Sequence, residues 1–390
     1  MPELPGALAE EISVEPAAPE PARRGPAPPK PLTGLSRQQI AWAIVALVFL
    51  AWCAWAFAED GTAFVALAAA GLAQGSVVAL AAIGFLVIEK ATGIANFAQG
   101  DLITLGAFLG VWATDQVGLA PDGLGLSLGL GYLLTLAIMF FVGVAIERVA
   151  YAPLRGRSVH VVVIATLGVA LVIRTILGLW QGTSPRSLQT WFGAGSSLDN
   201  FLFFQDGVLR IDIEFLGVHD AVISAQRVVI IVVTAVTVVA MMLLFSRTSF
   251  GRQVRALAAD RETARLYGVK ATRLSMLSFG IASLLAGLGG LMIGPLGSFD
   301  LTLGFSYMLL GFAAAVLGGF GSLGGVALGA VLIGFTEQLF GGLLLPRLVE
   351  HLGGDPANVL KYRSVFPYVL MLVVIAIRPQ GLFGKTERRL

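Results

Sequence analysis

Residues 247–273 read RTSFGRQVRALAADRETARLYGVKATR, the only long polar and basic stretch between two strongly apolar blocks of the chain. This stretch holds seven Lys or Arg residues. Within it, Glu262, Ala264 and Gly268 form the pattern E-x-A-x-x-x-G, which predicts a short helix that begins near the carboxylate and ends at the glycine. A basic loop of this kind is typical of a membrane subunit that binds a separate protein on its cytosolic side.

The composition independently indicates a membrane protein. Hydrophobic residues make up 56% of the 390 positions and charged residues 13%, whereas soluble domains contain about 25% charged residues. The 48 glycines allow helices to pack closely. We therefore predict an all-α polytopic membrane protein. The net charge of +2 argues against a nucleic-acid partner.

The two ends of the chain differ from the rest. Residues 1–39 contain nine of the 17 prolines and cannot bury enough apolar surface to fold, so we expect a disordered cytosolic tail. Residues 40–58 form an uninterrupted apolar run of about 28 Å as a helix, which predicts an additional N-terminal transmembrane helix. A cleaved secretory signal is disfavoured because a long polar segment precedes this run. Residues 385–390 are expected to be a second cytosolic tail.

The distribution of basic residues tests the number of membrane crossings. With the first run, the apolar blocks make about ten transmembrane segments; the other nine are 63–88, 92–114, 124–146, 160–181, 223–246, 274–297, 306–318, 322–345 and 364–378. With alternating crossings and both termini in the cytosol, the inner segments hold 19 Lys or Arg and the outer segments five, as the positive-inside rule requires. The block 306–318 is short and 92–114 is interrupted, so we expect both to be covered by protein.

Two glycine-rich stretches imitate nucleotide-binding motifs. Residues 319–324, GFGSLG, fit G-x-G-x-x-G but lie between apolar spans rather than in a βαβ unit. We interpret Gly321, Gly325 and Gly329 instead as one small-residue helix face for packing. Residues 381–386 imitate the end of a Walker A loop, but the chain stops four residues later. We expect no ATP site in this chain, so any ATPase must be another subunit.

Polar residues at membrane depth are candidates for the transport pathway. Asn96, Gln99 and Asp101 lie in GIANFAQGD, residues 93–101, where glycines indicate either a half-helix break that faces a solute or a bend near the cytosolic interface. Glu337 lies in the middle of a predicted span, where it lines the pathway or partners Gln338 or another span. Arg174 is expected to extend to the outer interface.

The sequence gives no pattern for metal binding or catalysis. The single cysteine, Cys53, lies in an apolar run without a companion ligand. The three histidines, His160, His219 and His351, have no ligand spacing. We therefore expect no metal, no cofactor and no enzymatic activity in this chain.

Several motifs together resemble one transporter family. These are ATGIANFAQGDLITLGAF at 91–108, YAPLRG at 151–156, GFAAAVLGGFGSLGGVALGA at 311–330 and RPQGLFG at 378–384. From about Gly71 to Gly384 the chain resembles permeases of the branched-chain amino-acid ABC importer family, of the first-permease type. The resemblance implies a permease domain over residues 62–384. The pattern of Glu262, Ala264 and Gly268 resembles the family's ATPase-coupling loop, E-A-A-x-x-x-G, although Thr263 occupies the second position.

The resemblance implies a location in the bilayer of the bacterial cytoplasmic (inner) membrane and three kinds of protein partner. These are a homologous second permease, two cytosolic ATPase subunits, and an extracytoplasmic solute-binding protein. We expect the solute-binding protein to dock on the outer face, including the loop 182–222, whose acids from Asp199 to Asp220 would meet basic residues of that partner. The implied function is alternating-access import of branched-chain or other small neutral amino acids. The family commonly has His in place of Gln99 and also serves urea and short amides, which stay alternatives.

An ion-coupled secondary transporter is the alternative from another class. Such a transporter needs intramembrane carboxylates with titrating partners. Only Asp101 and Glu337 are available, and neither is next to an obvious cation in the sequence.

Overall fold

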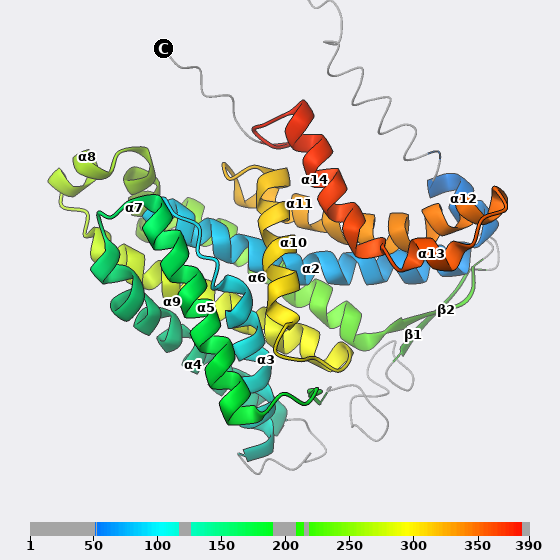
Figure 1. Cartoon of the computed structure of the whole chain (residues 1–390), viewed down its shortest axis with the longest axis horizontal. Coiled ribbons are helices and arrows are strands. Elements are labelled where there is room, and N and C mark those ends of the chain that lie inside the picture. Colours follow the sequence, from blue (N-terminus) through cyan, green and yellow to red (C-terminus); the bar gives the residue numbers. More distant parts are fainter. Residues whose placement is uncertain (1–50, 52, 117–125, 190–207, 214–217, 384–390) are drawn as a thin grey trace, which may run out of the picture. The chain divides into compact units, whose positions relative to one another are not determined.

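A computed structural model describes residues 51, 53–116, 126–189, 208–213 and 218–383, which belong to one compact unit that begins at Ala51 (Figure 1). The predicted tails 1–39 and 385–390 lie outside the described residues. So does most of the predicted first span 40–58, of which residues 51 and 53–58 are described and helical, as is Glu59.

The described chain is predominantly helical. Its α-helices are α2 (Gly61–Thr92), α3 (Gln99–Gln116), α4 (Leu126–Ile146), α5 (Val159–Gln181), α6 (Ala225–Arg247), α7 (Ser249–Ala259), α8 (Arg261–Leu266), α9 (Ala271–Ile293), α10 (Leu303–Gly318), α11 (Leu323–Phe335), α12 (Leu345–His351), α13 (Pro356–Leu360) and α14 (Phe366–Ile377). Short irregular turns extend some of them: a π-helical turn at Glu147–Tyr151 and 3₁₀ turns at Ala152–Leu154, Gly294–Leu296 and Arg363–Val365. A longer π-helical segment, Thr336–Leu344, joins α11 to α12.

Six described helices are long and apolar enough to cross a membrane. They are Gly61–Thr92, Leu128–Leu154, Val159–Gln181, Ala225–Arg247, Ala271–Leu296 and Leu323–His351. Two shorter apolar helices, Leu303–Gly318 and Arg363–Ile377, accompany them. The chain is therefore a multi-pass helical membrane protein, and the number of about ten crossings stays a prediction.

Helix α2 lies at the centre of the unit. The Asp60 carboxylate caps its start by accepting a hydrogen bond from the Ala63 amide at 2.8 Å, and Gly93 ends it in the left-handed conformation at φ 76°. Nearly all of its residues from Gly71 onward are buried, and it packs against α9, α10 and α11. A helix that is apolar on every side and buried on every side belongs to the protein core rather than to the lipid boundary.

Helices α4, α5 and α6 form an apolar periphery. Large hydrophobic side chains stand exposed along them, including Leu133, Phe141, Ile164, Leu179 and Val236. In water such a surface would be strongly unfavourable, whereas in a bilayer it faces hydrocarbon. The apolar composition of α4, α5 and α6 therefore fits a position at the lipid-facing surface.

The two irregular segments predicted to be covered by protein are covered. The predicted block 92–114 is interrupted between α2 and α3, where residues 93–98 are not helical. The short block 306–318 forms α10, which packs against α2, α3 and α11, and whose Gly304, Met308, Gly311 and Leu317 are buried. Most of α3 and most of α10 lie within the packed interior of the described unit, whereas Gly93 at the break is exposed.

One prediction about glycine packing is wrong. Gly321 is not on a helix face with Gly325 and Gly329, because it lies in the turn between α10 and α11 and helix α11 begins only at Leu323. Ser322 caps that helix through the Gly325 amide, which sets the later start. The other two glycines do pack closely: a Cβ on Gly329 would lie 2.6 Å from the Ala314 carbonyl oxygen, and one on Gly325 2.7 Å from the Gly318 carbonyl oxygen.

The all-α prediction also needs a correction. Strands β1 (Val208–Ile213) and β2 (Val218–Ser224) form an antiparallel two-stranded sheet, with a bulge between Ile211 and Ile213. The sequence VLRIDI alternates in polarity and is rich in β-branched residues, as a half-exposed strand requires. The sheet belongs to the predicted outer loop 182–222, but the structures of Asp199, Asp206 and Glu214 lie outside the described residues.

Contacts between distant segments sort the loops into two groups, in the way that alternating crossings predict. Loops predicted to be inner meet one another through Lys90 Nζ and the Gly321 oxygen (3.3 Å), Arg261 and the Ala91 oxygen (3.0 Å), and Arg155 and the Thr272 hydroxyl (2.9 Å). Loops predicted to be outer meet through Arg347 and Asp60 (2.7 Å) and through the backbones of Arg186 and Phe299 (2.9 Å). Figure 1 shows α7 and α8 at the opposite end of α2 from α12 and α13.

Candidate functional site

The connection from α2 to α3 is held by short polar side chains. The Thr92 hydroxyl accepts a hydrogen bond from the Ile94 amide at 3.3 Å, and the Asn96 side-chain oxygen accepts one from the Ala98 amide at 3.1 Å. The Phe97 amide donates to the Thr166 hydroxyl of α5 at 3.2 Å. An asparagine that accepts from an amide two residues later suits the beginning of a helix. Side-chain hydrogen bonds therefore give the connection between α2 and α3 a defined conformation.

Two amide side chains at this break are completely enclosed. Gln99 has an exposed fraction of 0% and Asn96 of 1%. The Gln99 Nε2 donates to the Ala282 oxygen of α9 at 3.0 Å, and Gly84 of α2 leaves the room for it, since a Cβ there would lie 2.0 Å from that nitrogen. Within the described part of the chain, Gln99 Oε1 and Asn96 Nδ2 have no hydrogen-bond partner. Buried polar atoms without a partner are uncommon and are candidates for contact with water or a solute.

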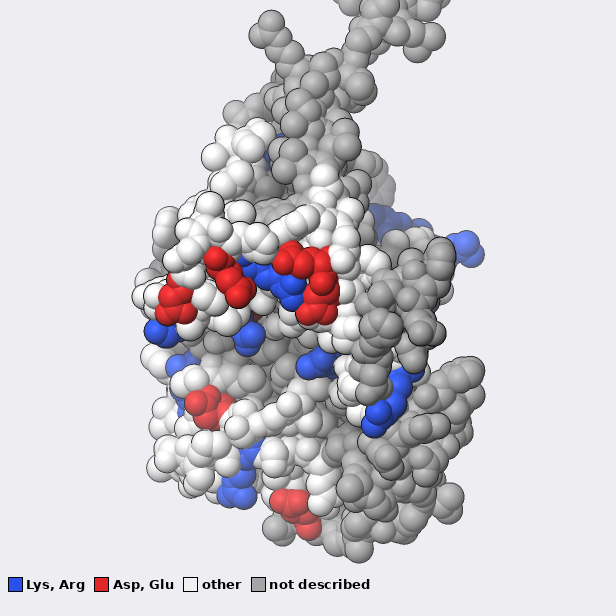
Figure 2. Space-filling view, turned by 90° about the vertical axis from the view of Figure 1, so that its right-hand side faces the viewer, with Lys and Arg blue, Asp and Glu red and all other residues white. Residues whose placement is uncertain are grey.

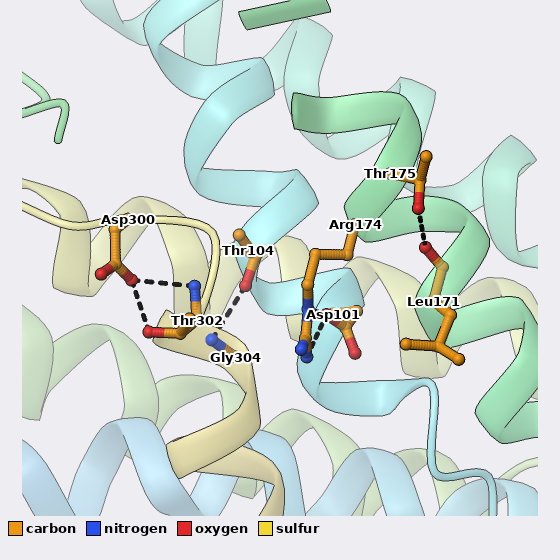
Figure 3. Close-up of polar contacts among 8 residues, drawn as sticks. All are labelled: Asp101, Thr104, Leu171, Arg174, Thr175, Asp300, Thr302 and Gly304. Atoms are coloured by element: carbon orange, nitrogen blue, oxygen red, sulfur yellow. Dashed lines mark hydrogen bonds and ion pairs between the residues drawn. The ribbon is translucent and has the colours of Figure 1, made fainter. Parts of the chain in front are cut away.

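Asp101, in the first turn of α3, forms an ion pair with Arg174 of α5 (Figure 3). The distance from Arg174 Nη2 to Asp101 Oδ1 is 2.9 Å, and Nε donates to the same oxygen at 3.0 Å. The expectation that Arg174 extends to the outer interface is therefore wrong, and Asp101, which has no cation beside it in the sequence, has one beside it in the fold. The Asp101 side chain is buried and Arg174 only partly exposed, so pairing is the favourable arrangement at membrane depth.

The same region joins α3 to α10. The Thr104 hydroxyl accepts a hydrogen bond from the Gly304 amide at 2.8 Å, close to the ion pair in Figure 3. Asp300 begins the turn before α10 by accepting from the Thr302 amide at 2.8 Å and from its hydroxyl at 2.7 Å. These hydrogen bonds lower the pKa of Asp300 below its ordinary range, so it stays ionised. Helices α3, α5 and α10 therefore meet around Asp101.

Glu337 has partners on two other segments. Its carboxylate accepts from Gln74 Nε2 of α2 at 2.6 Å and from the Ser364 hydroxyl at 3.1 Å. Gln338 donates to Gln74 Oε1. Glu337 lies in the π-helical segment Thr336–Leu344, and π-helical turns occur frequently at functional sites. Of the alternatives for Glu337, the structure shows a partner on another span.

Gln99 and Glu337 contact α2 at different heights along its axis. Gln99 contacts α2 at Gly84 and Glu337 contacts it at Gln74. Ten residues of helix correspond to about 15 Å along the axis. The structure therefore does not bring the four predicted pathway residues Asn96, Gln99, Asp101 and Glu337 into one site.

The loop 247–273, which we predict to be cytosolic, contains the predicted short helix. The Asp260 carboxylate caps α8 by accepting from the Glu262 amide at 2.9 Å and the Thr263 amide at 3.1 Å, so Glu262 lies in the first turn, as predicted. The hydrogen bond from the Thr263 hydroxyl, followed by that from its amide, lowers the pKa of Asp260. Gly268 follows the helix in the left-handed conformation at φ 82°, as predicted.

Two backbone hydrogen bonds close α8. The Val269 amide donates to the Ala264 oxygen at 3.1 Å and the Gly268 amide to the Arg265 oxygen at 3.0 Å, a pattern of the Schellman type. Ala264 is buried and belongs to the apolar core that includes residues of α2, α7 and α9. Helix α8 is thus attached to the membrane helices by a packed side chain.

The structure adds residues that sequence reasoning missed. Leu266 and Tyr267, at the end of α8, have exposed fractions of 87% and 85%. Their signal in the sequence is that two large hydrophobic residues stand side by side in a basic loop. Gln74 and Arg174 also escaped notice as partners, because nothing local in the sequence connects them to Glu337 or Asp101.

The end of the unit that carries α12, opposite α8, has a mixed charge cluster. Arg347 of α12 pairs with Asp60 at 2.7 Å and Glu59 at 3.6 Å, and His351 Nε2 lies 3.6 Å from Glu59. Figure 2 views the side that carries α12 and α13 and shows acidic and basic side chains close together there. Among the described residues no group of three or more His, Cys, Asp or Glu is placed to hold a metal ion.

The chain is similar in sequence to known transport proteins. A family described as the permease component of branched-chain amino acid transport systems matches residues 67–375. The chain is 30% identical over 321 residues to the high-affinity branched-chain amino acid transport system permease protein BraD of Pseudomonas aeruginosa, covering 81% of this chain and 94% of BraD. It is 27% identical over 323 residues to LivH of Escherichia coli, with the same coverage. A fructose import permease, FrcC of Rhizobium meliloti, is 26% identical over 193 residues, 46% of this chain and 49% of FrcC.

Proposed function

The chain belongs to the family of permease components of branched-chain amino acid transport systems, and on this premise we propose that it is the membrane subunit of an ATP-driven importer for branched-chain or other small neutral amino acids. The observation that carries the proposal is the family match, which extends over residues 67–375 and so includes every described helix from most of α2 to most of α14. ATP hydrolysis belongs to a separate subunit in this reading.

The proposed ATPase contact is α8. Its exposed Leu266 and Tyr267 offer an apolar contact in a basic loop, and the glycine-ended helix presents them on a fixed backbone. Ala264 anchors the other side of the helix in the core shared with α2 and α9. Because packed interiors transmit displacement rather than absorb it, movement of α8 with an ATPase would move the inner ends of these helices. Two ATPase subunits and a second permease complete the proposed complex.

The break between α2 and α3 is the proposed solute contact. Asn96 and Gln99 offer unpartnered neutral amide atoms, and the nearby Asp101 charge is balanced by Arg174. A lining without net charge suits a solute without net charge, such as a zwitterionic neutral amino acid. The solute-binding protein would supply it at the outer end, near the β1–β2 sheet.

Transport measurements distinguish this function from its alternatives. The chain would be expressed with its partner subunits in a host that lacks branched-chain uptake, and uptake of leucine, alanine, urea and a short amide compared. We expect leucine uptake that requires the ATPase subunits and persists with a protonophore while cellular ATP is maintained. Uptake that needs no ATPase and stops with the protonophore would instead identify an ion-coupled transporter, for which the Asp101–Arg174 pair would supply the titrating partner.

A further inference from the structure

A polar pocket lies at the inner ends of the membrane helices. Its volume is about 170 Å³, far above the 10–15 Å³ that a single water needs. It is lined by the end of α2 at Ala91 and Thr92, the turn at Arg155 and Gly156, α8 at Arg261 and Arg265, and the start of α9 at Ala271, Thr272 and Ser275, together with Tyr151. Three regions distant in sequence, 91–92, 151–156 and 261–275, therefore converge on one cavity.

Three guanidinium groups line this pocket. Arg155 donates to the Thr272 hydroxyl at 2.9 Å, and Arg261 donates to the Ala91 oxygen at 3.0 Å, which fixes both beside the cavity. Arg265 is exposed on α8. The pKa of Arg155 is lowered, first by burial and then by the charges of Arg265 and Arg261, so the three cations influence one another.

The opposing negative charge is incomplete. Glu147 pairs with Arg155 from the π-helical turn and balances one of the three cations. Glu262 and Asp260 of α8 are not among the residues that line the pocket. Ser275 lines it, is 4% exposed, and its hydroxyl has no hydrogen-bond partner in the described part of the chain. The pocket thus combines excess positive charge with an unsatisfied hydroxyl, as sites for anions do.

We propose that this pocket binds a phosphate group, held by Arg155, Arg261 and Arg265, that bridges α8 to the inner ends of α2 and α9. Arginine is suited to this ligand because its planar guanidinium donates two parallel hydrogen bonds to phosphate oxygens. The phosphate comes from an anionic lipid headgroup or from free phosphate. The lining residues lie at the inner ends of apolar helices, the level at which headgroups are found. A bound phosphate would hold α8 in place whether or not the proposed coupling function is correct.

The test uses the full chain in nanodiscs of phosphatidylcholine alone or with phosphatidic acid, and scores lipid retained after transfer to detergent by native mass spectrometry. Arg265→Gln and Arg261→Gln/Arg265→Gln are compared with Arg252→Gln/Arg273→Gln, which removes two exposed cations of the same loop that do not line the pocket. We expect the wild type and this control to retain phosphatidic acid, and each pocket arginine lost to reduce retention about fivefold. Arg265→Gln is included as a single variant because Arg265 is exposed, so this substitution should leave the fold intact.

A second arm distinguishes the source of the phosphate. The same proteins in phosphatidylcholine nanodiscs are titrated with inorganic phosphate, and with chloride at equal ionic strength, while thermal unfolding is followed. Stabilisation by phosphate that the pocket variants lose, without selective lipid retention, would identify free phosphate as the ligand. Equal lipid retention by the pocket and control variants, together with no specific effect of phosphate, would overturn the proposal.

Discussion

At the scale of single residues, the ion pair between Asp101 and Arg174 shows how a membrane interior accepts two charges. Each would be costly alone, and the 2.9 Å contact offsets part of that cost. Arg174 also lies over the Phe305 ring, 6.0 Å from its centre, which ties α5 to α10. Through these two contacts, the pair joins the start of α3 to α5 and α10.

Removing one partner of this pair should cost more than removing both. We expect Asp101→Asn or Arg174→Gln to destabilise the protein by about 1.5–3 kcal/mol, because each leaves the other charge without its hydrogen bonds. The double variant should recover part of that loss. Thermal unfolding of the four proteins in one detergent measures the coupling. Additive losses would show that the two side chains stabilise the protein independently.

Gly268 has a conformation that other residues adopt only with strain. We expect Gly268→Val to introduce about 1–3 kcal/mol of backbone strain at the end of α8. The altered helix end should reduce ATP hydrolysis stimulated by the solute-binding protein about fivefold or more. Glu262→Ala should act in the same direction. Assembly and ATP hydrolysis of the reconstituted complex are the measurements.

Gly353 provides the matched control for this change. It has φ 78°, a Cβ there would meet nothing within 4 Å, and it lies in the turn between α12 and α13 at the opposite end of α2. Gly353→Val therefore introduces the same backbone strain away from α8 and should leave the stimulated hydrolysis unchanged. Equal losses in the Gly268 and Gly353 variants would remove α8 from the ATPase contact.

At the scale of elements, glycine decides how closely α9 approaches α3. A Cβ on Gly290 would lie 2.3 Å from the Ile103 oxygen and 2.6 Å from the Ala107 nitrogen, both backbone atoms that cannot give way cheaply. We expect Gly290→Ala to destabilise the protein by about 1–3 kcal/mol. Gly168→Ala on α5 is the control, since a Cβ there meets nothing within 4 Å and should stabilise the helix by about 0.5–1 kcal/mol. Thermal unfolding should move in opposite directions, and a similar shift in both would refute close packing at Gly290.

The cap of α8 makes this element sensitive to acid. The folded state holds the pKa of Asp260 below its ordinary value of 3.8, so the capping contribution is present above that value and is lost as the pH falls through the lower, folded pKa. We expect amide exchange in 261–268, corrected for its intrinsic rate, to accelerate as the pH falls below about 4. Asp260→Asn keeps an acceptor without this titration and should show no such change. An equal acceleration in that variant would assign the effect to another group.

At the scale of the whole molecule, contacts divide the loops into two groups that lie at opposite ends of the unit (Figure 1). The group at α8 contains Lys90, Arg155 and Arg261, and the group at α12 contains Asp60 and Arg347. The positive-inside rule assigns the first group to the cytosol.

Cysteine labelling tests this orientation. With the single native cysteine removed as Cys53→Ser, Tyr267→Cys and Leu352→Cys place one thiol at each end, at positions with exposed fractions of 85% and 78%. We expect a membrane-impermeant maleimide to label Leu352→Cys in intact spheroplasts and Tyr267→Cys only after the membrane is opened. Labelling of both from the same side would contradict the alternating arrangement.

What the sequence determined by itself is local or statistical. Hydropathy predicted most of the described apolar helices within a few residues of their observed ends, although α3 begins seven residues later than its block. Gly93 and Gly100 indicated a break or a bend before α3, and the pattern around Glu262 and Gly268 predicted α8 with its left-handed glycine. These features depend on neighbours three or four residues away or on an average over a span, and such information is present in a linear chain.

What only the tertiary structure decided is which distant side chains meet. Arg174 finds Asp101 across 73 positions and Gln74 finds Glu337 across 263, while Arg155, Arg261 and Arg265 converge on one pocket. Gly321 falls outside its expected helix because Ser322 caps α11, and a polar alternation in an outer loop becomes the β1–β2 sheet once the two strands pair. Pairings of this kind are fixed by how helices pack and cross, and no local pattern along the chain encodes the partner.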